Sequence, residues 1–349
     1  MDTKIRVGFI GAGDICRVRH LPGLAKLDQV EVVTICNRSR DSAQKVADEF
    51  DVAEVDDDWH QLVQRKDLDA VFIGTWPYMH KEMSIAVLES GKHCFCQARM
   101  CMNLAEAKQM LAVAQNHPEL VNMLCPPPTR MPFEPYIRQL IESDQIGQMT
   151  LVELTAVSGG NLDRQCIHWR ERVEYSGQQI MAMGIFAETL NAAVGPYEQL
   201  SAQTATPIGT KTDEDGDSIE IGIPQVVTVA GRLDNGALAV EHHTGLATDD
   251  SSPGSCLTIW GLKGTLRYRF GDNIEFAPAG QPMRPVDVPD ELQRPWLVEL
   301  DFVEAVRSAK RGQPWSVSPD FAEGLLYMRK VEAVHGSAAA GHAVRPAQL

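Results

Sequence analysis

Two glycines near the start of the chain have the spacing of a phosphate-binding turn. An apolar run over residues 5–10 enters a turn at Gly11 and Gly13, and helix-compatible sequence follows. The first glycine allows the tight bend, the second lets the backbone approach a diphosphate, and Cys16 at the third position is small enough for close helix–strand packing. The diphosphate would bind the N–H groups of the new helix. The alternative is a structural turn in another α/β fold. The residues expected to hold the diphosphate are Gly11, Ala12, Gly13, Asp14 and Ile15.

The residues after the next predicted strand bear on the kind of dinucleotide. The apolar run over residues 30–36 ends in Asn37, Arg38 and Ser39, where the adenosine ribose of a bound dinucleotide would lie. NAD enzymes usually carry a carboxylate there for the ribose 2′-OH, but neither Asn37 nor Arg38 is acidic. Arg38 can pair with a 2′-phosphate, and Ser39 can donate to it. We therefore expect NADP to be preferred over NAD; the alternative is that Arg38 only stacks on the adenine or faces solvent.

Two further strand ends carry polar and aromatic residues. Apolar runs over residues 69–74 and 93–96 predict buried parallel strands, and ligand sites lie at the carboxyl ends of such strands. For His80 we favour a simpler interpretation, in which it caps or orients the next helix. The residues at these ends that are assigned to cofactor contact are Thr75, Trp76, His80 and Gln97.

The order of strand and helix patterns predicts two domains. The two patterns alternate up to residue 125, and a triple proline at 126–128 then excludes regular structure. Residues 1–126 are therefore predicted to form an α/β domain with a doubly wound parallel sheet of the Rossmann type. Residues 127–349 show longer strand patterns, interrupted by a helix over about residues 177–194. They predict an α+β domain with a large, mostly antiparallel, open-faced sheet.

Composition and charge argue against several classes of protein. The formal net charge of −15 is unfavourable for nucleic acid or an anionic membrane as the main partner. No apolar run reaches the length of a membrane-spanning helix, and the first residues lack the regions of a signal peptide. The eight cysteines are scattered, and those at positions 94, 96 and 101 do not have a zinc-binding spacing. We expect a cytoplasmic protein with reduced thiols and no metal site.

With these motifs in place, the chain resembles the Gfo/Idh/MocA family (glucose–fructose oxidoreductase, inositol dehydrogenase and MocA) over nearly its whole length. The resemblance implies a Rossmann domain, an open-faced sheet domain often used for oligomerisation, a nicotinamide cofactor, and substrates among sugars, polyols or related compounds. Because an exposed sheet face usually needs covering, we expect a homodimer or homotetramer. The segments that carry the resemblance are residues 8–15, 75–80, 91–96, 146–147, 168–170, 261–267 and 302–306, and the helix after Asn103.

The acid–base residues that the family usually carries have no counterpart here. Family members have Glu-Lys-Pro after the strand that ends at residue 96, and the lysine assists proton transfer. This chain has Gln97-Ala98-Arg99, so the lysine position is Ala98. Many members also carry Asp, and His four residues later, on a helix facing the nicotinamide. The matching positions are Ala182 and Phe186.

Other residues are then needed for proton transfer and substrate binding. Oxidation of an alcohol needs a base, and the reverse reaction needs an acid or an oxyanion stabiliser. Arg99 is a poor base because a guanidinium stays protonated, but it can hold a carboxylate or stabilise an enolate. His168, in the sequence His-Trp-Arg, is the predicted acid–base residue, unless that stretch is only a structural loop. Gln97 and Arg99 are predicted to position the substrate. Weaker candidates for proton transfer are Tyr175, His20 and Glu188, and at most one of His242 and His243 faces the site. The residues predicted to bind substrate are Arg99, Arg130, Trp169, Arg170 and Phe186.

These observations predict an NAD(P)-dependent oxidoreductase that acts on a sugar, sugar acid or related carbonyl or polyol compound with an atypical acid–base group. Two alternatives stay open. One is a non-redox lyase, isomerase or glycosidase that retains and recycles its NAD cofactor. The other is a protein that binds nucleotide or sugar without catalysis.

Overall fold

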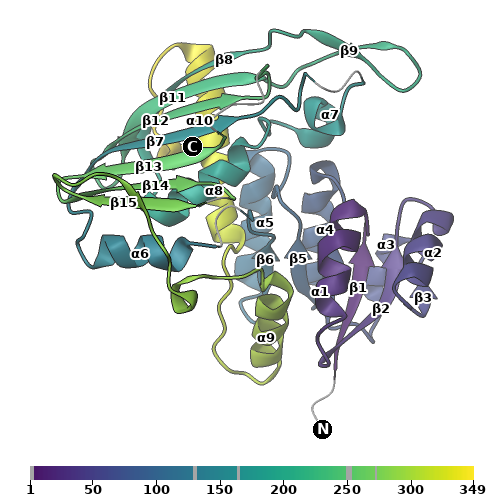
Figure 1. Ribbon diagram of the computed structural model, residues 1–349. Helices are drawn as coiled ribbons and strands as arrows, with labels where there is room; N and C mark the ends of the chain where they lie inside the picture. Colours follow the sequence, from purple (N-terminus) through teal and green to yellow (C-terminus); the bar gives the residue numbers. More distant parts are fainter. Residues whose placement is uncertain (1–3, 129–131, 163–165, 249–253, 272) are drawn as a thin grey trace. The chain divides into compact units, whose positions relative to one another are not determined.

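The computed structural model describes residues 4–128, 132–162, 166–248, 254–271 and 273–349, and the chain divides into two compact units (Figure 1). Unit 1 comprises Met1–Pro126 and Leu297–Leu325, and unit 2 comprises Pro127–Trp296 and Leu326–Leu349. The prediction that everything after residue 126 belongs to the second domain is therefore corrected. The chain returns to unit 1 because Phe302 packs edge-to-face on Phe72 and Phe95, with ring centroids 5.1 and 5.5 Å away.

Unit 1 contains a six-stranded parallel sheet in the order β3-β2-β1-β4-β5-β6. This is the doubly wound order of a dinucleotide-binding fold, in which the connections change direction between β1 and β4. The predicted Rossmann-type sheet is confirmed. Its strands are β1 (Ile5–Ile10), β2 (Val30–Cys36), β3 (Glu54–Val55), β4 (Ala70–Ile73), β5 (His93–Cys96) and β6 (Asn122–Leu124). Its helices are the π-helix η1 (Cys16–His20), α1 (Leu21–Leu24), α2 (Arg40–Glu49), α3 (Trp59–Gln64), α4 (Pro77–Glu89), α5 (Leu104–Asn116) and α9 (Val298–Lys310).

Polar side chains cap the start of α2, α3 and α5 in unit 1. Ser39 caps α2 by accepting from the N–H of Ser42 at 3.3 Å, and Asn103 caps α5 by accepting from the N–H of Glu106 at 3.0 Å. The strands β4 and β5 are buried along their whole length, as is typical of parallel strands covered on both faces.

Unit 2 is built on an eight-stranded sheet in the order β16-β15-β14-β13-β7-β12-β11-β8. Its neighbouring strands pair antiparallel except β7 and β12, which are parallel. The predicted large, mostly antiparallel sheet is confirmed. The strands are β7 (Met149–Val157), β8 (Tyr197–Ala205), β11 (Val226–Leu233), β12 (Leu238–Thr244), β13 (Cys256–Gly261), β14 (Gly264–Arg269), β15 (Ile274–Pro278) and β16 (Arg284–Pro285). A separate hairpin pairs β9 (Thr210–Thr212) with β10 (Ser218–Glu220).

One face of this sheet carries the core of unit 2. Side chains from α6 (Glu134–Glu142), α8 (Met183–Val194) and α10 (Phe321–Ala340) pack on it in one apolar cluster. The helix expected over 177–194 begins only at Met183, because Gly177 and Met181 have φ values of 62° and 44°, which no right-handed helix accommodates. A short helix α7 (Val173–Ser176) precedes it, and the remaining turns are η2 (Trp169–Glu171), η3 (Asp290–Leu292) and η4 (Pro346–Gln348).

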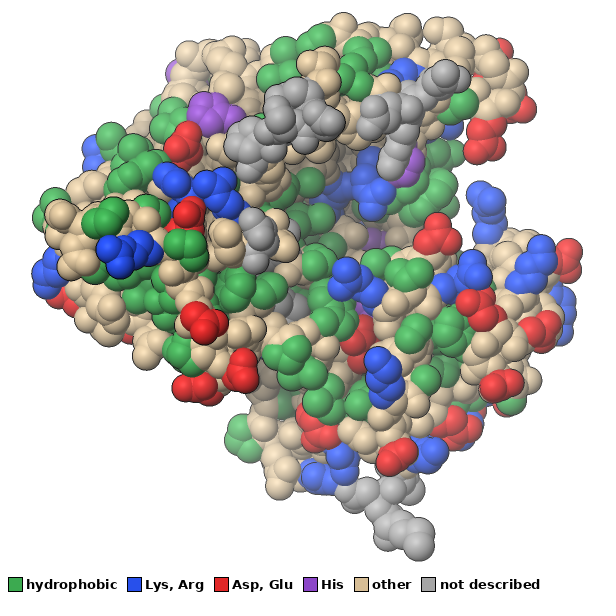
Figure 2. Space-filling view, in the orientation of Figure 1, with side chains coloured by type: hydrophobic (Ala, Val, Ile, Leu, Met, Phe, Trp, Pro, Cys, Tyr) green, Lys and Arg blue, Asp and Glu red, His purple; other side chains and the backbone are tan. Residues whose placement is uncertain are grey.

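Acidic and basic side chains are interspersed on the face drawn in Figure 2. Among the described residues, no helix combines the length and the apolar character needed to cross a membrane.

Candidate active site

The glycine turn after β1 lies against the end of β4. Gly11 has a φ of 80°, and a Cβ there would lie 2.6 Å from the Cγ2 atom and 2.8 Å from the backbone nitrogen of Thr75. A Cβ at Gly74 would in turn lie 2.4 Å from the carbonyl oxygen of Gly11. Gly11 and Gly74 fit where the ends of β1 and β4 meet because neither has a side chain. Gly13 differs, because a Cβ added to it would meet no heavy atom within 4 Å. The space beside Gly13 is therefore open.

The turn leaves room for an anion at the start of a helix. Asn37 fixes it from the end of β2, because its Oδ1 atom accepts from the N–H of Ala12 at 2.7 Å. Helical backbone starts at Asp14, and Asp14 and Ile15 are exposed. The first N–H groups of a helix have no partner within the helix, so they can bind an anion. The open space at Gly13 lets the anion approach them.

The two arginines after β2 have different surroundings. Arg40 donates to both oxygens of Asp57, at 2.8 and 2.7 Å. Arg38 is exposed, and its guanidinium forms no hydrogen bond or ion pair with the residues that the structure describes. Ser39 uses its Oγ atom as the cap acceptor of α2 and keeps its hydroxyl proton for donation.

His80 joins the loops that follow β4 and β5. It is fully buried, with Nε2 2.8 Å from the carbonyl oxygen of Thr75 and Nδ1 2.8 Å from that of Arg99. Burial lowers the pKa of His80, although the two carbonyl oxygens favour the charged ring. The neutral ring has one N–H, so at neutral pH it donates to one oxygen and packs against the other. Both loops are tied to one side chain, and Trp76, in the loop after β4, is 36% exposed.

The turn after β5 is also held from within the unit. The N–H of Ala98 donates to Oε1 of Gln97 at 3.1 Å, and the amide nitrogen of Gln97 contacts Nε2 of His20. Glu299 contacts the other ring nitrogen of His20 at 2.5 Å. Gln97 and Arg99 are both buried, with 7% and 4% of their surfaces exposed. Unit 1 thus brings together the end of β5, His20 and a carboxylate from α9.

The thiols of unit 1 are buried. Burial raises the pKa of Cys16 and of Cys94 to about 12, which keeps both thiols protonated. Among the described residues, no group of three His, Cys, Asp or Glu side chains is placed to hold a metal ion.

The His-Trp-Arg stretch in unit 2 is a short capped turn. The backbone N–H of His168 donates to Oε2 of Glu171 at 3.0 Å, and Nδ1 of His168 accepts from the N–H of Arg170 at 3.3 Å. Because Nδ1 is an acceptor, the neutral ring carries its proton on Nε2. The Arg170 guanidinium lies over the Trp169 ring, 4.2 Å from its centroid. His168, Trp169 and Arg170 therefore lie together.

Glu171, which the sequence analysis did not single out, anchors this turn. Its Oε1 atom lies 2.8 Å from Nζ of Lys211, and only 7% and 6% of the two side chains are exposed. Lys211 also donates to the carbonyl oxygen of Asn161 at 2.5 Å. This buried ion pair ties the turn to β9 and to the loop after β7. The only indication of this role in the sequence is that Glu171 lies three residues after His168.

The positions matched to the family's acid–base pair are apolar in their surroundings. Ala182 is the N-cap residue of α8 and Phe186 lies in its first turn, packed 5.3 Å from the ring of Phe270 and 6.2 Å from that of His243. Glu188, the weaker candidate on the same helix, is buried. Tyr175 lies under the guanidinium of Arg172 at 5.4 Å. Arg130, predicted to bind substrate, lies outside the described residues.

A second buried ionic cluster in unit 2 was also missed. The ammonium of Lys330 lies 2.6 and 2.8 Å from the two oxygens of Glu241, and Nε2 of His243 lies 2.8 Å from one of them. Burial lowers the pKa of Lys330 and would raise that of Glu241, but Lys330 and His243 bring the Glu241 pKa down to about 2. His242 points to the opposite face, with about half of its side chain exposed.

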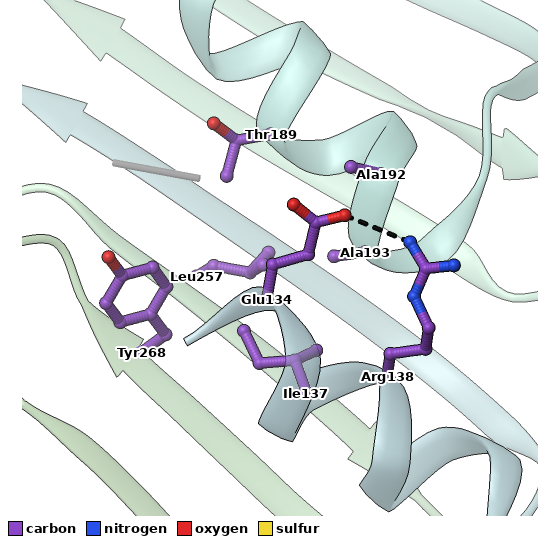
Figure 3. Close-up of a pocket in the computed structure, with 8 residues that line it drawn as sticks. All are labelled: Glu134, Ile137, Arg138, Thr189, Ala192, Ala193, Leu257 and Tyr268. Carbon is purple, nitrogen blue, oxygen red and sulfur yellow. Dashed lines mark hydrogen bonds and ion pairs between the residues drawn. The ribbon is translucent and has the colours of Figure 1, made fainter. Parts of the chain in front are cut away.

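Figure 3 shows a small cavity between α6, α8 and the sheet of unit 2. Its volume of about 10 Å³ is room for about one water molecule. Glu134 and Arg138 pair beside it at 3.0 Å. This cavity is too small for a sugar. The lining residues are Glu134, Ile137, Arg138, Thr189, Ala192, Ala193, Leu257 and Tyr268.

Comparisons with known proteins agree with this architecture. Residues 5–124 match the model of an oxidoreductase family with an NAD-binding Rossmann fold, and residues 136–267 match that of a GFO/IDH/MocA C-terminal domain. A dTDP-3,4-didehydro-2,6-dideoxy-alpha-D-glucose 3-reductase of Streptomyces violaceoruber is 23% identical, over 98% of this chain and 96% of the reductase. An uncharacterized oxidoreductase of Synechocystis sp. is 24% identical, over 84% of this chain and 81% of its own.

Among solved structures, levoglucosan dehydrogenase in complex with NADH and L-sorbose has a TM-score of 0.88 at 21% identity, covering 99% of this chain and 100% of the dehydrogenase. At that identity the likeness shows the fold. The two family models together span most of the chain, and the protein therefore belongs to the Gfo/Idh/MocA family of oxidoreductases with an NAD-binding Rossmann domain.

Proposed function

We propose that the protein is an NADP-preferring oxidoreductase that interconverts a hydroxyl and a carbonyl group on a sugar, sugar acid or related polyol. The observation that carries this proposal is the turn at the β1–β4 junction, where Gly11 fits only as glycine and Gly13 leaves space for a diphosphate. Two relatives support the substrate class by their names, a dTDP-sugar reductase and levoglucosan dehydrogenase.

The cofactor residues are proposed from unit 1. Residues 11–15 hold the diphosphate, Asn37 keeps the turn in shape through the N–H of Ala12, and Arg38 with Ser39 takes the 2′-phosphate. The other residues proposed to contact the cofactor lie at the ends of β4 and β5 or next to them. They are Thr75, Trp76, His80 and Gln97. A bound nicotinamide supplies or accepts the hydride.

We expect Arg38→Leu to weaken NADPH binding about tenfold and to change NADH binding less than about threefold. A hydrogen bond to a charged group contributes about 1.5–3 kcal/mol, and only NADPH has the 2′-phosphate. Fluorescence titration with both nucleotides measures the two dissociation constants. Arg40→Leu is the matched control, because Asp57 engages that guanidinium. Equal losses for NADPH and NADH in Arg38→Leu would contradict the assignment.

The proton-handling group is proposed to be His168. With Nδ1 accepting from the backbone, the neutral ring presents an Nε2–H donor that can stabilise negative charge on a substrate oxygen. Glu171 and Lys211 hold the turn that carries it. Arg99 is proposed to orient a carboxylate or enolate, and Trp169 and Arg170 to offer stacking and hydrogen bonds to a sugar.

We expect His168→Ala to lower kcat more than about tenfold, because general acid–base groups contribute at least that much. The measurement is the steady-state rate of NADPH oxidation with a carbonyl sugar that the wild type reduces. His242→Ala, at a half-exposed histidine on the other sheet face, is the control and should keep the wild-type rate. A wild-type rate in His168→Ala would remove this residue from the mechanism.

A further inference from the structure

Three buried side chains connect the interior of unit 1 to the turn after β5. His20 is fully buried, with its ring 5.9 Å from that of Phe72 and 5.0 Å from that of Phe95. Glu299, of which 3% is exposed, places Oε1 2.5 Å from Nδ1 of His20. On the opposite side of the ring, Nε2 of His20 contacts the side-chain nitrogen of Gln97. The three polar groups form a continuous hydrogen-bond chain inside an aromatic cluster.

The donors in this chain all point the same way. The backbone N–H of Ala98 donates to Oε1 of Gln97, so the amide group faces His20 with its nitrogen, which is only a donor. Nε2 of His20 must then be the acceptor, and the ring proton is on Nδ1, where it is donated to the carboxylate of Glu299. An amide cannot take up or release a proton at neutral pH, so this chain does not deliver protons to the turn.

The packing leaves room for the carboxylate. A Cβ added to Gly23 would lie 2.8 Å from Cδ and from Oε2 of Glu299. Gly23 therefore permits the close approach of α9 to α1 that brings Glu299 to His20. The sequence shows the same carboxylate as an exception on an apolar helix face, since Phe302, Val303 and Val306 follow it at spacings of three, four and seven.

We propose that His20 and Glu299 are positioning residues: they hold the amide of Gln97 and, through the N–H of Ala98, the turn between β5 and α5. This inference rests on the proposed function, because the turn lies at the carboxyl edge of the sheet, where this fold binds its dinucleotide. Gln97 then holds the turn by accepting from the backbone N–H of Ala98. His20 is removed from the candidates for proton transfer.

The first test removes the chain without leaving a buried charge. In the full-length variant His20→Leu/Glu299→Met, both replacements are apolar and of similar size, so the unit should fold. We expect the dissociation constant for NADPH to change less than threefold, because the glycine turn and Arg38 are untouched. The fluorescence enhancement of the bound nicotinamide should fall by at least half, and kcat at least tenfold. Unchanged fluorescence and kcat would overturn the positioning role.

The second test reverses the chain. In Glu299→Gln/Gln97→Glu, the new amide can donate to Nδ1 and the new carboxylate can accept from Nε2, while Ala98 keeps its acceptor. Nitrogen-15 NMR of His20 should show the proton on Nδ1 in the wild type and on Nε2 in this variant, and the nicotinamide fluorescence should recover relative to the apolar variant. A wild-type ring protonated on Nε2 would overturn the hydrogen-bond polarity.

The two failures are distinguishable. If the wild type binds neither NADPH nor NADH, the proposed function fails and the positioning role fails with it. If the wild type binds NADPH and the apolar variant matches it in fluorescence and kcat, only the positioning role fails.

Discussion

Gly13→Val is expected to weaken binding of both NADPH and NADH at least 100-fold while leaving the melting temperature unchanged. An added Cβ meets no heavy atom of the protein within 4 Å, and Gly13 does not have the left-handed backbone that a side chain would strain. The valine side chain would instead fill the space that a diphosphate needs beside the helix N–H groups. A 100-fold loss corresponds to about 2.7 kcal/mol of binding free energy. Calorimetric titration and thermal unfolding measure the two quantities.

Gly11→Ala is the matched variant, with the opposite expectation. Gly11 has a φ of 80°, and its added Cβ would meet backbone atoms of Thr75. A non-glycine residue in that region costs about 1–3 kcal/mol, so the free energy of unfolding should fall by at least that much. If Gly13→Val unfolds the protein, the space beside Gly13 is not open. If this variant binds both nucleotides like the wild type, that space is not the diphosphate site.

The largest effect on stability is expected at the ionic cluster of unit 2. Lys330→Met should lower the free energy of unfolding by about 3–5 kcal/mol, because it leaves Glu241 charged and buried without its cation. The ammonium also lies over the Tyr197 ring, 5.3 Å from the centroid, so that contact is lost as well. Urea unfolding followed by circular dichroism gives the free energy.

Two controls separate burial from charge. Lys330→Met/Glu241→Gln removes both charges and should recover most of the loss. Lys263→Met removes the ion pair between Lys263 and Asp144, whose side chains are both more than half exposed. This variant should lower the free energy of unfolding by less than about 1 kcal/mol. If Lys330→Met lowers the free energy of unfolding no more than Lys263→Met does, Glu241 is not a buried charge that depends on Lys330.

The same cluster predicts how the stability of unit 2 decreases at acidic pH. The pKa of Glu241 is lowered from 4.5 to about 2 in the folded protein, so the unfolded chain takes up a proton first as the pH falls. The stability that Glu241 contributes is therefore complete above pH 4.5 and decreases between pH 4.5 and about 2.

Much of the fold follows from local sequence patterns. The strand at residues 30–36 has the expected bounds, because its apolar run has clear ends. The return of residues 297–325 to unit 1 was not predicted, because an amphipathic helix reveals that it has an apolar face but not which sheet it covers. Phe302 finds its partners in Phe72 and Phe95, more than 200 residues earlier.

The site was predicted unevenly for a related reason. Motif residues such as Gly11 and Gly13 are recognised by their spacing, whereas Glu299 and Lys330 act through partners far away in sequence. Each of them was visible as a charge among apolar neighbours on a helix, since Tyr327, Ala333 and Val334 around Lys330 are all buried. A charge in such a position predicts a buried counter-charge without identifying it.

The most direct measurement identifies the nucleotide in the purified protein by mass and follows its absorbance at 340 nm in a single turnover with carbonyl sugars. We expect an exchangeable NADPH that is oxidised in a stoichiometric amount as one of these compounds is reduced, and no nucleotide bound to Gly13→Val. A tightly retained NAD whose redox state shows no net change during turnover would contradict it and favour a non-redox enzyme with a recycled cofactor. A protein that binds neither nucleotide would contradict the central claim that the glycine turn holds a nicotinamide dinucleotide.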